Sequence, residues 1–196
     1  MDIYKELKRQ VIEPILKKFL FRKTGNVFTR EMESGVVHVF EISIKTATKD
    51  DFSLSVNYGI YFNKLMELLY GFPLNIKHGT GDCIYHGSTK KKEIKQYWIS
   101  NHFKSFEVFK DDVSGSLENS IIPFLNGIVT GEQLLALFQD DINNYIKNDS
   151  TLALKIGCLN FLLGEKDKGN EIVRMVIRAS KERYEFAEKV LERMGS

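Results

Sequence analysis

VVHVFEISIKTATKDDFSLSVNYGIYF, the stretch from Val36 to Phe62, decides the fold. From Phe52 onward every even position is apolar or aromatic, whereas the odd positions as far as Gly59 carry serine, asparagine or glycine. This period of two is typical of a β-strand, because successive strand side chains point to opposite faces. Residues 36–45 repeat the alternation, and a polar connector joins the two halves. The stretch therefore predicts two long antiparallel strands that share one apolar face and one polar face.

Helices and further strands are predicted on both sides of this pair. An apolar residue at every fourth position from Ile3 to Phe19 predicts an amphipathic helix over residues 2–20. Pro14 lies inside this helix and should kink it, because proline has no amide hydrogen to donate. Residues 26–32 predict a strand that turns into the central pair and completes a three-stranded meander. Later short strands are expected over residues 83–85, 97–99 and 106–109.

Apolar spacing in the remaining chain predicts helices. A helix of residues 65–69 should end at Gly71, and helices are expected from residue 111 onward, over 131–147 and over 150–163. Thr130 and Gln133 have the spacing of a capping box, and Gly164 is a natural left-handed helix end. Residues 165–194 form either one broken helix or two.

The predicted fold class is therefore α+β. An antiparallel meander backed by the N-terminal helix should be followed by a C-terminal helical bundle. We expect one domain over residues 1–148 and a helical extension over residues 149–196 that packs on it.

Composition excludes several classes of protein. A net charge of +2 is too small for nucleic-acid or membrane binding through overall charge. No apolar run approaches the roughly 20 residues that span a bilayer, and the first residues lack the basic and then apolar pattern of a signal peptide. Cys83 and Cys158 lie far apart in the sequence. We therefore expect a cytoplasmic protein with two free thiols and no membrane partner.

Several short segments of the first 140 residues or so resemble a known bacterial family. They are LFRKTGNVFTR at residues 20–30, FEIS at 40–43, FSLSVNYGIY at 52–61, DC at 82–83 and YWI at 97–99. Together they are similar to the domain-of-unknown-function family 4304. Its members usually show a glycine where this chain has Leu20 and a tryptophan where it has Tyr97. The resemblance implies an α+β fold and, because the family is functionally uncharacterised, it carries over no catalytic residue.

Metal and catalytic motifs are weak in this sequence. His78, Cys83 and His86 are close in sequence, but a structural zinc site needs a fourth ligand, which would have to be His38 or His102 from elsewhere. The glycine-rich segment matches neither a phosphate-binding loop nor a dinucleotide fingerprint, and no nucleophile elbow is present. We therefore expect no metal, no cofactor and no catalytic residue assignable by motif.

The polar face of the central strands is one candidate binding surface. Short hydroxyls and a carboxylate held on rigid strands could bind a ligand or partner by hydrogen bonds, with Glu41 as a possible base. A solvent-exposed sheet face would show the same residue types without any function. The candidate residues are Glu41, Ser43, Ser53, Ser55, Asn57 and Tyr61.

A basic and aromatic segment is the alternative surface. Lysines next to aromatic residues are typical of proteins that bind single-stranded nucleic acid, although lysine runs more often mark solvated loops. Nucleic acid is therefore not the expected partner. The residues of this alternative, within segment 89–104, are Lys90, Lys91, Lys92, Lys95 and Trp98.

The sequence leaves three hypotheses of function. The first is a non-enzymatic protein-binding module, antitoxin-like or immunity-like, whose partner is another protein. The second is an enzyme or small-ligand binder that uses the polar sheet face, and the third is a nucleic-acid binder through segment 89–104. The sequence does not determine the oligomeric state.

Overall fold

The computed structural model describes two compact units, each built from several segments of the chain. Unit 1 comprises Met1–Glu31, His38–Ile60 and Lys77–Gly127, and unit 2 comprises Met32–Val37, Tyr61–Ile76 and Ile128–Ser196. The chain therefore passes between the units several times. The described residues are 3–46, 52–71, 79–88, 98–99, 105–138, 141–180 and 184–195.

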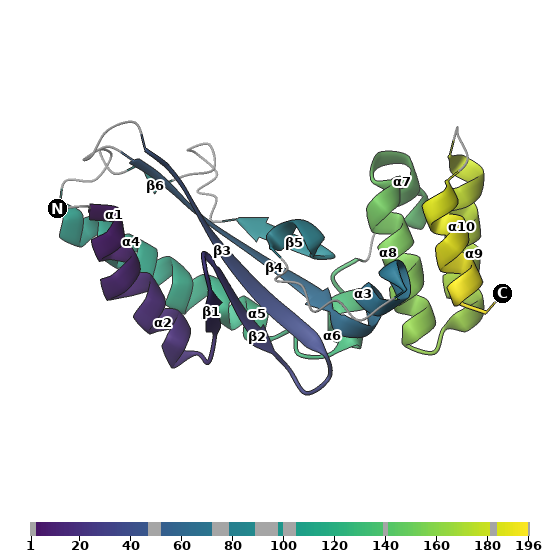
Figure 1. Ribbon diagram of the computed structural model, residues 1–196, viewed down its shortest axis with the longest axis horizontal. Coiled ribbons are helices and arrows are strands. Elements are labelled where there is room, and N and C mark those ends of the chain that lie inside the picture. The colour runs from purple at the N-terminus through teal and green to yellow at the C-terminus, as the bar shows by residue number, and fades with distance from the viewer. Residues whose placement is uncertain are drawn as a thin grey trace. The chain divides into compact units, whose positions relative to one another are not determined.

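The β-sheet has the order β1-β2-β3-β4-β5, with β6 paired to β4 (Figure 1). The pairs β1–β2, β4–β5 and β4–β6 are antiparallel. The two long strands are β3 and β4, as the alternation predicts, so the α+β class is confirmed. The strands are β1 (Arg22–Thr24), β2 (Val27–Glu31), β3 (Val36–Thr46), β4 (Phe52–Phe62), β5 (Tyr85–Ser88) and β6 (Trp98–Ile99).

The short strands differ in part from the prediction. Strand β1 was not expected, and it pairs with β2 through a two-residue turn in which Gly25 has a φ of 65°. The predicted strand at residues 83–85 begins only at Tyr85, because residues 80–82 form a helical turn, η2 (Thr80–Asp82). The predicted strand at residues 106–109 is wrong. That segment starts a helix, since the Ser105 side chain caps it by accepting from the Val108 amide.

Both long helices of unit 1 contain a π-helical turn just before a proline. The N-terminal helix consists of α1 (Ile3–Leu7), η1 (Lys8–Ile12) and α2 (Glu13–Lys18), and the second consists of α4 (Phe106–Ser116), η4 (Leu117–Ile121) and α5 (Ile122–Asn126). Pro14 and Pro123 each stand second in the α-helical segment that follows the turn. A wider turn accommodates a residue that has no amide hydrogen, so the predicted defect at Pro14 does not end the helix.

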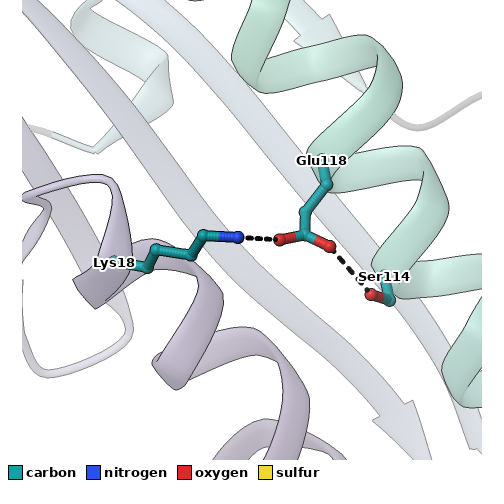
Figure 2. A network of polar contacts seen from close by, with 3 residues as sticks. All are labelled: Lys18, Ser114 and Glu118. Atoms are coloured by element: carbon teal, nitrogen blue, oxygen red, sulfur yellow. Dashed lines mark hydrogen bonds and ion pairs between the residues drawn. The ribbon is translucent and has the colours of Figure 1, made fainter.

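The two helices of unit 1 are joined by a polar contact. Lys18 Nζ lies 3.0 Å from Glu118 Oε1, and Ser114 Oγ donates to Glu118 Oε2 over 3.5 Å (Figure 2). Both charged side chains are partly exposed, so this pair contributes little to stability. The apolar core beside it supplies more of the stabilisation, because Ile12, Leu16 and Leu117 are fully buried.

Unit 2 is mainly helical. The predicted capping box is confirmed, because Thr130 Oγ1 accepts from the Gln133 amide and Gln133 Oε1 accepts from the Thr130 amide. The predicted single helix over residues 131–147 is wrong, since a new helix starts where the Asp141 side chain accepts from the Asn143 amide. Helices are α3 (Asn63–Tyr70), α6 (Gly131–Leu135), α7 (Ile142–Asn148), α8 (Ser150–Leu162), α9 (Lys166–Ala179) and α10 (Glu185–Arg193).

Glycines let α8 and α9 pack closely. A Cβ atom on Gly169 would lie 2.7 Å from the Gly157 carbonyl oxygen, so only glycine allows this approach. The chain after Gly164 forms two helices, α9 and α10, which settles the alternative that the sequence left open. The boundary expected at residue 148 falls between α7 and α8, inside unit 2. In the described part of the chain, no helix combines the length and apolar character needed to cross a membrane.

Candidate functional site

The polar face of the central strands is partly covered by the chain itself. Glu41 Oε2 accepts hydrogen bonds from the Thr80 amide, over 3.1 Å, and from Thr80 Oγ1, over 2.8 Å. A Cβ atom on Gly59 would lie 2.5 Å from Cys83 Sγ, so the segment of η2 packs directly on β4. Glu41 therefore anchors this segment. A catalytic base needs a carboxylate that can reach a substrate, whereas Oε2 of Glu41 already accepts two hydrogen bonds from Thr80.

Three other residues of this predicted surface form hydrogen bonds with one another. Ser55 Oγ donates to Asn57 Oδ1 over 2.8 Å, and Asn57 Nδ2 lies 3.5 Å from Ser43 Oγ. Ser55 is only 4% exposed, and Tyr61, which belongs to unit 2, is 8% exposed. The side chain of Ser53 lies outside the described residues. Ser55 and Tyr61 therefore offer little surface to a ligand, and binding by this face stays a prediction.

The basic alternative falls mainly outside the described residues. Lys90, Lys91, Lys92 and Lys95 belong to that part, as does the side chain of Trp98. The backbone of Trp98 is described, and it pairs with Leu54 of β4. The strand predicted around Trp98 is therefore confirmed, whereas nucleic-acid binding stays an untested alternative.

The potential metal ligands are dispersed where the structure describes them. Cys83 is buried against the polar face at Gly59, His86 is exposed on β5, and His38 is buried on β3. His78 and His102 lie outside the described residues. Within the described ranges, no three histidine, cysteine or acidic side chains come close enough together to hold a metal ion.

Aromatic side chains occupy the opposite face of the sheet in unit 1. Tyr58, Tyr85 and Phe124 form a triangle whose ring centroids are 5.2–6.4 Å apart, and this triangle packs α5 against the strands. Burial, followed by the neighbouring Tyr85, raises the pKa of Tyr58 to about 12. The Tyr58 hydroxyl is therefore protonated at neutral pH, and its role is packing and hydrogen bonding.

The turn between α2 and β1 was not singled out by the sequence motifs. The Phe21 amide donates to the Leu16 carbonyl over 2.9 Å, and the Leu20 amide donates to the Lys17 carbonyl over 3.0 Å. These two bonds form a Schellman motif, in which the residue after the helix adopts a left-handed conformation and is usually glycine. Here that residue is Leu20, with a φ of 66°. Leucine at such a position costs roughly 1–2 kcal/mol through the contact of its Cβ with the backbone.

Leu20 is also strongly exposed. Its side chain is 79% accessible, more than that of any other large hydrophobic residue in the described part of the chain. Burial inside the protein therefore does not offset its backbone strain. Lys17 and Arg22 flank it, both exposed, and neither forms an ion pair with a described residue. An apolar side chain thus stands between two cations on an exposed turn.

The sequence did contain one signal for this turn. The resemblance to the uncharacterised family places a glycine at the position of Leu20, and the left-handed φ explains why glycine suits it. The family model for "Domain of unknown function (DUF4304)" matches residues 12–127 of this chain, which include this turn.

The chain belongs to this family. The match to DUF4304 ends at Gly127, which is also the last residue of unit 1. No curated protein and no solved structure gave a significant match. DUF4304 membership therefore establishes the family without assigning an activity.

Proposed function

We propose that this DUF4304 protein is a protein-binding module that docks a partner through the turn between α2 and β1, with Leu20 as its apolar anchor. The observation that supports the proposal is the combination of strain and exposure at Leu20, which has a φ of 66° and is 79% accessible. Backbone strain without internal compensation is characteristic of functional positions. A partner that covers Leu20 would recover about 1.5–3 kcal/mol from its burial, enough to offset the strain.

The flanking charges define the partner's surface. Lys17 and Arg22 are exposed and have no ion pair among the described residues. A protein with an apolar pocket and an acidic rim would complement both the leucine and the two cations. An antitoxin-like or immunity-like role is one form of this proposal, with a toxin as the acidic partner. Cys83 and Cys158 are buried and form no disulfide, which supports the cytoplasm as the compartment in which we place the interaction.

The test compares three forms of the tagged full-length chain in capture from lysate of its host, namely wild type, Leu20→Gly and Val108→Ser. Val108 is the control because it is a large hydrophobic residue, 50% exposed, on a different element, α4. Leu20→Gly preserves the fold, since glycine readily adopts the left-handed conformation. We expect one stoichiometric protein with wild type and Val108→Ser, reduced at least tenfold with Leu20→Gly.

Equal capture by Leu20→Gly and wild type would contradict the proposal. Nuclease treatment of the lysate separates a protein partner from one held through nucleic acid. With the captured partner purified, the double change Lys17→Glu and Arg22→Glu should slow association and weaken its dependence on salt, because rim charges act mainly on the association rate.

A further inference from the structure

Arg30, on β2, lies in a cluster of neutral hydrogen-bond acceptors. Its Nη2 atom donates to Asn126 Oδ1 over 2.7 Å and lies 3.0 Å from His38 Nδ1, and its Nη1 atom donates to the Phe19 carbonyl over 3.3 Å. A guanidinium carries five N–H donors, so these contacts leave two of them unused. One of the unused donors is on Nε, which is buried and has no hydrogen-bond partner in the part of the chain that the structure describes.

The positive charge of Arg30 has no counter-charge among the described residues. No carboxylate hydrogen-bonds to it, and the side chain is about half buried. Burial lowers the pKa of Arg30, and no neighbouring anion opposes that effect. A half-buried cation with only neutral partners is costly, because neutral acceptors replace the lost hydration incompletely. Among the described residues, no negative charge balances that of Arg30 in this cluster.

The arrangement limits how an anion could reach this charge. Arg30 Cζ lies 4.7 Å from the centroid of the Phe21 ring, which covers one face of the guanidinium. His38, on the adjacent strand, is fully buried. Asn126 is exposed at the C-terminal end of α5, and its amide nitrogen donates to no described residue. The accessible edge of the cluster is therefore the side of Asn126, where an entering ligand would meet donors from both Arg30 and Asn126.

We propose that Arg30 and Asn126 form a binding site for a carboxylate ligand. A carboxylate carries one negative charge and two coplanar oxygens, which match the single charge and planar donors of a guanidinium. It would accept from the Arg30 guanidinium in place of the neutral Asn126 oxygen and would also accept from the Asn126 amide nitrogen. His38 acts as a positioning residue, because its Nδ1 holds Nη2 in place. This proposal does not rest on the docking role of Leu20, although Arg30 contacts both chain neighbours of that residue, through the Phe19 carbonyl and the Phe21 ring.

The test uses sodium acetate as the probe on the full-length, ¹⁵N-labelled chain. The resonance of the Arg30 side-chain Nε–H group is followed during titration, with sodium chloride at equal ionic strength as the control for salt. Acetate should shift this resonance saturably, and chloride should not. Sodium phosphate in a parallel titration tests the choice of carboxylate, since a preference for phosphate over acetate would overturn it.

Matched variants locate the site. Asn126→Asp supplies an internal carboxylate beside Arg30 and should weaken acetate binding at least tenfold, while keeping the side-chain size. Asn119→Asp adds the same charge at another exposed position of the same long helix, in η4, and should bind acetate as wild type does. Equal acetate affinity in Asn126→Asp and wild type, or no acetate effect beyond that of chloride, would overturn the proposal.

Discussion

The helices α2 and α8 end with the same hydrogen-bond pattern, but different residue types occupy the left-handed position of that pattern. At the end of α8, the Glu165 amide donates to the Asn160 carbonyl and the Gly164 amide donates to the Phe161 carbonyl, with Gly164 at a φ of 99°. At the end of α2, the equivalent bonds place Leu20 in the left-handed position. Glycine occupies this position without strain, whereas leucine does not.

This difference separates a structural helix end from a candidate functional one. A Cβ atom on Gly164 would meet nothing within 4 Å, so space alone does not require glycine there. The glycine of α8 is explained by backbone conformation. Backbone conformation does not explain the leucine after α2. Its side chain is mostly exposed, so burial within the protein does not offset the backbone strain. A third left-handed end, Gly71 after α3, extends the comparison to a tightly packed case.

Gly71→Ala should have the largest effect on stability. Gly71 has a φ of 82°, and a Cβ atom there would lie 2.9 Å from Arg193 Nε. Strain and displacement of Arg193 together should lower the free energy of unfolding by about 2–3 kcal/mol. Urea denaturation followed by circular dichroism measures the change. If the free energy of unfolding fell no more than in Gly164→Ala, displacement of the Arg193 side chain would contribute nothing to the loss.

Arg193→Ala should have the next largest effect. Arg193 Nη1 donates to the carbonyls of Leu68 and Leu69, which are acceptors at the C-terminal end of α3. Losing these bonds and the favourable charge at the helix end should cost about 1–2 kcal/mol. The double variant with Gly71→Ala should be destabilised by less than the sum of the single changes, because both act on the same contact. Strict additivity in the same urea measurement would contradict this coupling.

Gly164→Ala measures the cost of backbone strain without any steric clash. With open space around the position and a φ of 99°, the expected loss is about 1 kcal/mol, and it comes from strain alone. Thermal unfolding measured by calorimetry is sufficient to detect it. Alanine at Gly81, which also has open space but no positive φ, serves as the control and should change stability by less than half of this amount, about 0.5 kcal/mol.

Leu20→Gly should have the smallest effect, and of the opposite sign. Relief of strain favours the folded state, while the added freedom of glycine favours the unfolded chain, so the net gain should be about 0.5–1 kcal/mol. The leucine side chain is 79% exposed, so little apolar burial is lost. A loss of stability in calorimetry would show that Leu20 is held by internal packing and would remove the main support for its docking role.

Local patterns in the sequence predicted much of the fold. Alternation predicted β3 and β4, and helix ends at Gly71 and Gly164 followed from glycine alone, because those signals act over a few residues. The capping box at Thr130 has the same local character. Strand β1 and the helix start at Ser105 were missed, because three-residue strands and short aromatic runs carry little periodicity.

Less of the candidate site could be predicted from the sequence. Glu41 looked available on a polar strand face, yet Thr80, 39 positions later, donates two hydrogen bonds to it. No sequence motif singled out Arg30, yet Asn126, 96 positions away, accepts a hydrogen bond from its guanidinium. Contacts between residues so far apart depend on topology, and no local pattern encodes them.

The sequence by itself determined the α+β class, the two long strands and several helix ends, since alternation, caps and glycines act through neighbouring residues. Only the tertiary structure decided which polar groups remain available. It buried Ser55, engaged Glu41, left Arg30 without a counter-charge among the described residues and set Leu20 in a strained, exposed turn. The physical reason is that burial and hydrogen-bond satisfaction depend on segments brought together by folding, and these are distant in the chain.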